Sequence, residues 1–200
     1  MTPTLRWHSR PRTVPALEVS FIILVVVWLV FLLQSLGLWR LLFAPWLGEG
    51  MVPRDFDYLL SGPITMPLLH GGLEHLTGNS VALAVLLPLF FLSHSQWKTA
   101  WGRLALLWIV AGLLLWIIGP GASRHIGASG LVYALTGYLV VYGLRGGHWV
   151  ALASGVLVLF FQAASIWSGL IPVDPGISYA GHWSGLLVGA SVGWFAVKQR

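Results

Sequence analysis

Residues 127–130 read Gly-Ala-Ser-Gly and residues 181–185 read Gly-His-Trp-Ser-Gly, and each motif opens an apolar stretch. Ser129 and His182 therefore place a hydroxyl and an imidazole at the heads of two hydrophobic segments. Polar groups at membrane depth are costly, and they are kept mainly where they pair with one another or carry out chemistry. The two motifs predict membrane helices whose polar ends meet.

The composition agrees with a membrane protein. Of the 200 residues, 57% are hydrophobic and 8% are charged, and the mean hydropathy is +0.82. A soluble domain of this size does not need so much apolar surface. The chain has no cysteine, which excludes disulfides and thiolate chemistry. The net charge is +5, and the charged residues lie at the ends of the apolar segments. They therefore indicate membrane topology rather than a nucleic-acid partner.

Six apolar segments approach the roughly 20 residues that a helix needs to cross a bilayer. In lipid each must be helical, because no water satisfies the backbone there. The fold class predicted is an all-α membrane protein, a bundle of six transmembrane helices. The segments are 17–38, 75–92, 101–118, 129–144, 149–168 and 182–197. They form one domain over 17–197, with short tails at 1–16 and 198–200.

The first apolar segment could instead be the core of a cleaved signal peptide. It continues to about Leu38, however, and no small-x-small cleavage site follows it. With the N-terminus inside, eight of the 11 Lys and Arg residues fall on the cytoplasmic side and three on the other. This bias predicts a multi-pass protein with both termini in the cytoplasm and with Ser129, His182 and His75 at the outer side.

The longest connection, about 39–74, is too polar to span and is expected to lie at the membrane interface in short amphipathic pieces. It leads to His75 and Asn79, which are four residues apart and share one helix face. An imidazole and an amide there can donate hydrogen bonds to a developing oxyanion, together with the Ser129 backbone N–H at a helix start. Polar contacts that hold helices together explain the pair equally well.

Ser129 alone indicates little, since small residues are common where membrane helices touch. His182 needs a partner, and Gly185 and Gly189 lie on its face, where they allow another helix to approach closely. The helix that begins at Ser129 is the best candidate, because Gly130 is also small. Such an approach would let the imidazole activate the hydroxyl.

Tyr133, one turn after Ser129, can pack against the imidazole of His182 and fix its orientation. No acidic residue falls within these two helices to serve as a third member. The residues therefore predict a Ser–His dyad.

In their order and positions, these motifs resemble the rhomboid family of intramembrane serine proteases, in its minimal six-helix bacterial form. The resemblance covers residues 17–197. It rests on His75-x-x-x-Asn79, Gly127-x-Ser129-Gly130 with Tyr133, and Gly181-His182-x-x-Gly185-x-x-x-Gly189.

The resemblance implies that Ser129 is the nucleophile, His182 the general base, and His75 with Asn79 the oxyanion stabilisers. His70 would be a structural histidine near the mouth of the site. The family acts on transmembrane protein substrates within the bilayer without metal or cofactor, which implies a bacterial inner-membrane location. One departure is that many members carry a Trp-Arg pair shortly before the position of His70, where residues 61–63 here read Ser-Gly-Pro.

The sequence disfavours three other functions. The seven histidines include no His-Glu-x-x-His motif, which disfavours a metalloprotease. A transporter would carry more ionisable residues within its helices. A rhomboid-like pseudoprotease, which binds membrane proteins without cutting them, is disfavoured because the serine, the histidine and both oxyanion candidates are present.

Overall fold

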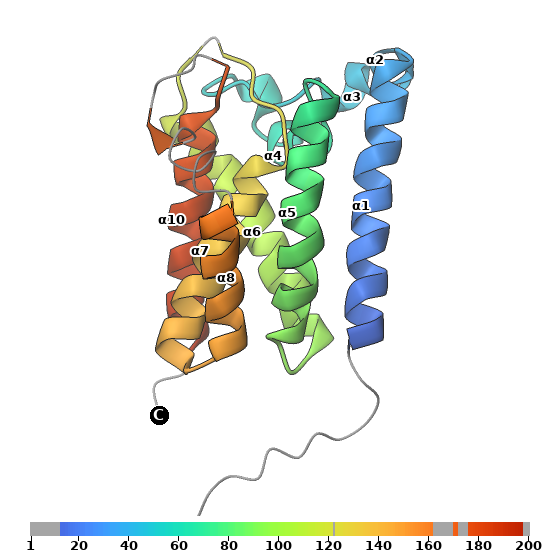
Figure 1. Cartoon of the computed structure of the whole chain (residues 1–200). Helices are drawn as coiled ribbons and strands as arrows, with labels where there is room; N and C mark the ends of the chain where they lie inside the picture. The colour runs from blue at the N-terminus through green and yellow to red at the C-terminus, as the bar shows by residue number, and fades with distance from the viewer. Residues whose placement is uncertain (1–12, 122, 162–169, 172–175, 198–200) are drawn as a thin grey trace, which may run out of the picture.

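The computed structural model describes residues 13–121, 123–161, 170–171 and 176–197. Among these residues, six long helices stand side by side in one bundle (Figure 1), one for each predicted apolar segment. They are α1 (Thr13–Ser35), α5 (Leu73–Leu92), α6 (Trp97–Ile118), α7 (Ser129–Gly146), α8 (Trp149–Phe161) and α10 (Tyr179–Ala196). No strand occurs among the described residues. The prediction of an all-α membrane bundle is confirmed. The predicted end of the fifth segment, 162–168, and the tails 1–12 and 198–200 lie outside the described residues.

The first helix differs from its prediction at both ends. It begins at Thr13 rather than at residue 17, and it ends at Ser35 rather than at Leu38. Gly37 stops it, because its φ of 73° is left-handed, a conformation that glycine adopts at little cost. The apolar run therefore continues past the helix into a turn.

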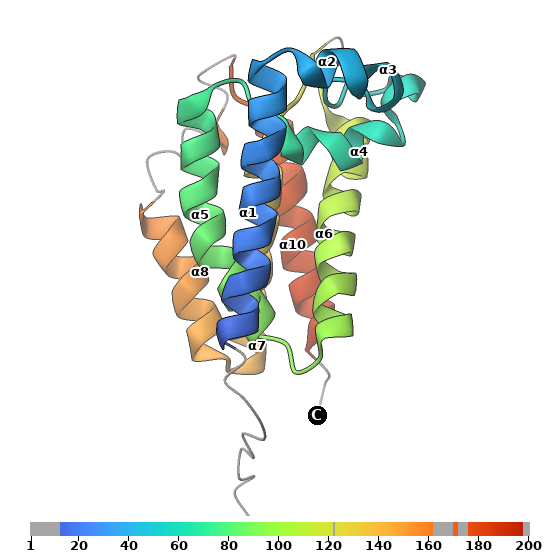
Figure 2. The same ribbon diagram turned by 90° about the vertical axis from the view of Figure 1, so that its right-hand side faces the viewer.

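Helix α7 lies at the centre of the bundle and packs against α10, α8, α5 and α6. Its residues 130–139 are all buried. Helix α1 lies at the edge of the bundle (Figure 1) and packs mainly against α5, next to which it stands in Figure 2. A helix surrounded by protein need not be uniformly apolar, and this explains why α7 can carry polar and small residues.

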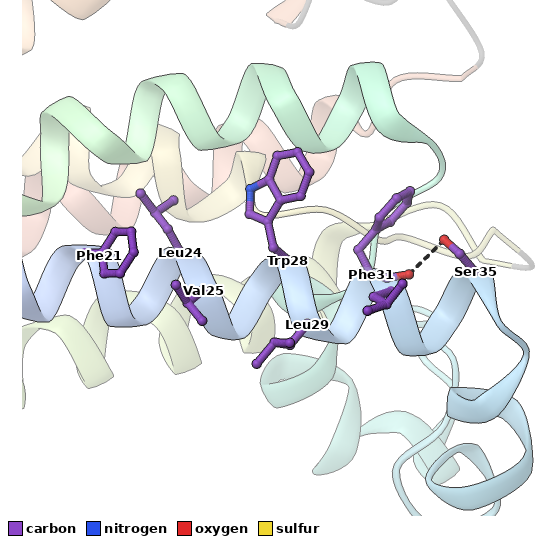
Figure 3. A pocket seen from close by; sticks show the side chains of 8 residues that line it. Phe21, Leu24, Val25, Trp28, Leu29, Phe31 and Ser35 are labelled. Atoms are coloured by element: carbon purple, nitrogen blue, oxygen red, sulfur yellow. Dashed lines mark hydrogen bonds between the residues drawn. The ribbon is translucent and has the colours of Figure 1, made fainter.

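Within the part of the chain that the structure describes, three helices are long and apolar enough to cross a membrane by themselves, namely α1, α5 and α6. A groove of about 630 Å³ follows one face of α1 (Figure 3) and is almost entirely apolar. Its lining includes Phe21, Leu24, Val25, Trp28, Leu29 and Leu32. None of its lining residues belongs to the candidate site, and an apolar face of this kind suits contact with lipid.

Short helices form the connection between α1 and α5 at one end of the bundle (Figure 1). They are α2 (Leu38–Leu42), α3 (Ala44–Leu47), η1 (Phe56–Tyr58), α4 (Ser61–Thr65) and η2 (Met66–Leu68). Several of their apolar side chains are exposed, among them Trp46 and Phe56. Exposed apolar side chains on short helices suit a membrane interface, as predicted for this connection.

At the place of the family's Trp-Arg pair, the connection is attached to α6. The Nε1–H of Trp108 donates to the carbonyl oxygen of Pro63 at 2.9 Å. Gly112 provides the space, since a Cβ there would lie 2.7 Å from the Pro63 Cα. Proline, tryptophan and glycine thus fix this part of the connection.

Candidate active site

Ser129 is the first residue of α7 and is partly buried. The loop before it runs down into the bundle (Figure 1) and pairs with the connection between α1 and α5. Met51 and His125 exchange two backbone hydrogen bonds of 2.9 and 2.8 Å, and the Gly127 N–H donates to the Met66 carbonyl at 2.9 Å. These bonds satisfy backbone groups that irregular structure would otherwise leave unpaired at this depth. They also fix where α7 begins.

His182 lies in the first turns of α10 and is buried. Ser178 caps this helix, because its Oγ accepts from the Gly181 N–H at 3.3 Å. The Nε2 of His182 lies 2.8 Å from the Oγ of Ser129, which is hydrogen-bond distance. The structure thus brings together the two side chains on which the sequence prediction depended.

Close contact between α7 and α10 makes this distance possible. A Cβ at Gly185 would collide with the carbonyl oxygen of Gly130, and one at Gly189 with that of Ala134. The colliding atoms are backbone, so no side-chain rotation could relieve either contact. Only glycine fits at both positions, and the two helices pack backbone against backbone.

Tyr133 lies against His182, as its position one turn after Ser129 suggested. The two rings stack with centroids 4.2 Å apart and an interplanar angle of 13°. This stacking limits rotation of the imidazole and keeps Nε2 directed at Ser129.

His75 and Asn79 lie on α5 beside the loop that precedes Ser129. A Cβ at Gly127 would overlap the His75 ring and would lie 3.6 Å from the Asn79 Nδ2. The φ of Gly127 is 115°, which side chains rarely adopt, so both the space and the backbone require glycine. His75 is exposed, whereas Asn79 is buried.

The Nδ2 of Asn79 is a buried donor with no hydrogen-bond partner among the described residues. Buried donors of this kind are rare and call for a functional or structural explanation. The Nδ2 lies beside Gly127, two residues before Ser129. A group bound next to Ser129 could therefore serve as the partner of this donor.

His70 lies in the turn before α5 and contacts the loop that precedes Ser129. Its Nε2 accepts from the Ala128 N–H at 3.4 Å, and its Nδ1 lies 3.4 Å from the Leu68 carbonyl. Burial, with a further contribution from His75, lowers the pKa of His70 to about 4. The ring is therefore neutral at pH 7, as acceptance from Ala128 requires.

Gln34 of α1 was missed in the sequence analysis. Its side-chain amide donates to the His70 carbonyl at 3.0 Å and accepts from the His70 N–H at 3.1 Å. The signal that could have revealed it is a lone amide in an apolar helix, since such a group needs a partner.

The site contains a hydroxyl, imidazoles and an amide. Among the residues that the structure describes, no three His, Asp or Glu side chains gather as a metal site would require. The chemistry that this group of residues can perform is nucleophilic attack by Ser129 with proton transfer to His182.

Comparison with known proteins identifies the family. The Rhomboid domain matches residues 60–199. The chain is 35% identical over 199 residues to the uncharacterized protein Mb1372 of Mycobacterium bovis, with 94% of this chain and 78% of the relative covered. The uncharacterized protein Rv1337 of Mycobacterium tuberculosis matches with the same identity and coverage. An uncharacterized Mycobacterium leprae protein, ML1171, is 35% identical over 137 residues, covering 62% of this chain and 51% of the relative. The chain belongs to the rhomboid family of intramembrane serine proteases, and it is an integral membrane protein.

Proposed function

We propose that this protein is an endopeptidase that hydrolyses peptide bonds of transmembrane substrates with a Ser129–His182 dyad. The observation that carries the proposal is the 2.8 Å approach of the His182 Nε2 to the Ser129 Oγ. The two groups come from helices that pack backbone against backbone, so their separation is fixed by the fold. Such preorganisation is what an activated nucleophile needs.

In the proposed first step, the Ser129 Oγ attacks the carbonyl carbon of the scissile bond while its proton passes to the His182 Nε2. The C–N bond then breaks, and His182 returns the proton to the leaving amine. A water molecule attacks the resulting acyl-enzyme, again giving a proton to His182, which restores it to Ser129. The products are a carboxylate and an amine, and no other reactant is consumed.

The proposed oxyanion hole consists of His75, the Asn79 Nδ2 and the Ser129 backbone N–H. The unpartnered Nδ2 supports this role, since a donor kept free in a buried place is available to a charge that develops during reaction. The Ser129 N–H belongs to the first turn of α7, where backbone donors have no intrahelical partner. In this proposal His70 holds the loop before Ser129, and Tyr133 holds the ring of His182. Close approach of the neighbouring groups is allowed by four glycines, Gly127, Gly130, Gly185 and Gly189.

In the proposed topology, six helices of a domain over 17–197 span the membrane. Both termini lie in the cytoplasm, and the site lies toward the outer side. The support is the eight-to-three division of Lys and Arg residues between the two sides that the sequence gives for this topology. A bacterial inner membrane is the location that goes with this arrangement.

The test uses a fluorophosphonate probe on the full chain in detergent, with single-turnover cleavage of a tagged single-span protein as the second measurement. The wild type should be labelled and should cleave, and Ser129→Ala should do neither. His182→Ala should be nearly as inactive, and the double variant should be little worse than either, because members of a catalytic unit are not additive. Absence of labelling in a folded wild type would support a pseudoprotease, and cleavage by Ser129→Ala would refute the dyad.

A further inference from the structure

A second hydrogen-bonded bridge joins the two segments that carry the dyad. The buried ring of His125 lies between two hydroxyls, with its Nδ1 2.6 Å from the Ser178 Oγ and its Nε2 2.8 Å from the Ser123 Oγ. His125 belongs to the loop before α7, and Ser178 is the residue that caps α10. The bridge therefore links the loop that leads to the nucleophile with the helix start that leads to the base.

The proton positions in this bridge follow from its partners. The Ser123 hydroxyl donates its only proton to the Pro120 carbonyl at 2.6 Å, so its oxygen must accept from the His125 Nε2–H. The Nδ1 of the neutral ring is then an acceptor, and the Ser178 hydroxyl donates to it. The Ser178 oxygen remains able to accept from the Gly181 N–H. Burial lowers the pKa of His125, which agrees with a neutral ring.

The bridge and the dyad have the same spacing in the chain. His125 comes four residues before Ser129, Ser178 comes four residues before His182, and each bond joins residues 53 apart. The main chain continues the link, because the His182 N–H donates to the Ser178 carbonyl at 3.0 Å. Any shift of the α10 start relative to the loop would therefore change both bonds together.

We propose that His125 and Ser178 are positioning residues that hold the start of α10 in register with the serine loop and so set the Ser129–His182 distance. This inference rests on the function proposed above. Ser178 then has two roles, as the cap of α10 and as the donor to His125. The role in register depends on the hydroxyl proton, whereas the cap depends only on the oxygen.

The experiment measures the rate constant of fluorophosphonate labelling of Ser129 in the full chain in detergent, together with the thermal unfolding midpoint. His125→Leu should lower the labelling rate on the order of 10- to 100-fold, as a misplacement of about 1 Å does in other enzymes. His125→Asn has nearly the same shape as leucine, but its amide oxygen can accept from Ser178. It should label within about threefold of the wild type, because one of the ring's two hydrogen bonds is retained.

Variants at position 178 separate the register from the cap. Glycine is a good N-cap and costs a helix only a few tenths of a kcal/mol, but it has no hydroxyl to offer His125. Ser178→Gly should therefore label as slowly as His125→Leu, whereas Ser178→Thr should label like the wild type. Combining His125→Leu with Ser178→Gly should cost no more than either change alone. Ser191→Ala is the matched control, since this exposed α10 serine donates to the Leu187 carbonyl of its own helix and to no other described residue.

Equal labelling rates for His125→Leu and His125→Asn would overturn the proposal, and so would wild-type labelling by Ser178→Gly. If His125→Leu does not fold, the comparison of Ser178→Gly with Ser178→Thr decides the question alone. A folded wild type that is not labelled would refute the proposed function, which is a different result from a labelled wild type whose variants are unaffected.

Discussion

Replacing Gly189 by alanine tests whether contact between α7 and α10 sets the geometry of the dyad. The new Cβ would lie 2.7 Å from the carbonyl carbon and 2.9 Å from the Cα of Ala134. Carbon atoms make favourable contacts at roughly 3.5–4.0 Å, so α10 must move by about 0.8 Å or more. Carried to the dyad, that movement would lengthen the 2.8 Å bond between His182 and Ser129 to about 3.6 Å, where it is no longer a hydrogen bond.

The expected consequences concern both activity and stability. A displacement of this size should lower the single-turnover rate on the order of 10- to 100-fold. Overpacking costs about 1–3 kcal/mol, and the upper part of this range applies here because the obstructing atoms are backbone. The better helix propensity of alanine offsets up to about 1 kcal/mol of it. The free energy of unfolding should therefore fall by roughly 1–2 kcal/mol.

The assay compares Gly189→Ala with Gly102→Ala, both within long helices. A Cβ at Gly102 of α6 would meet nothing within 4 Å, so this control should leave cleavage unchanged and should not lower the unfolding midpoint. Single-turnover cleavage and thermal unfolding in detergent are measured for both variants. Wild-type cleavage by Gly189→Ala with an unchanged midpoint would refute the idea that this contact fixes the dyad.

Three further outcomes are expected. Asn79→Ala should lower turnover on the order of 10- to 1,000-fold with little change in substrate affinity, and a purely affinity-based loss in single-turnover kinetics would contradict an oxyanion role. The pKa of His70 is lowered from 6.5 to about 4, so the unfolded chain binds more protons between these values and the free energy of unfolding should fall as pH drops through this range. The unfolding midpoint of His70→Gln should depend less on pH than that of the wild type. The same dependence on pH in both proteins would exclude His70 as its source. Reporter fusions should place the loop at Lys98 inside and the connection at Asp55 outside, and reversed signals would refute the six-span topology.

The approximate positions of the helices could be predicted because a helix that crosses a membrane needs a long apolar segment. The approach of His182 to Ser129 was also predictable, since an imidazole at membrane depth needs a partner and glycines marked the side on which it would be found. The end of α1 could not be predicted, because apolar residues continue past the left-handed turn at Gly37. Hydropathy carries no signal for such a turn. Backbone conformation, not composition, ends that helix.

The bridge between His125 and Ser178 was beyond the reach of the sequence for another reason. Both residues lie in irregular segments, where no periodicity tells which side chains face one another. Their meeting depends on how deep the serine loop descends, and that depth is set by backbone pairing with Met51 and Met66. Such contacts between loops become visible only in three dimensions.

The placement of the two dyad members on α7 and α10 also has a consequence for synthesis. The base follows the nucleophile by 53 residues, which a ribosome adding about 5–20 residues per second needs roughly 3–10 seconds to make. During that interval a growing chain carries Ser129 without the imidazole that is proposed to activate it. If His182 activates Ser129 as proposed, Ser129 stays an ordinary, unreactive hydroxyl until α10 has been made and has packed against α7. On the mechanism proposed here, proteolytic competence therefore begins only when this late helix docks, so an unfinished chain poses no hazard to the membrane proteins around it.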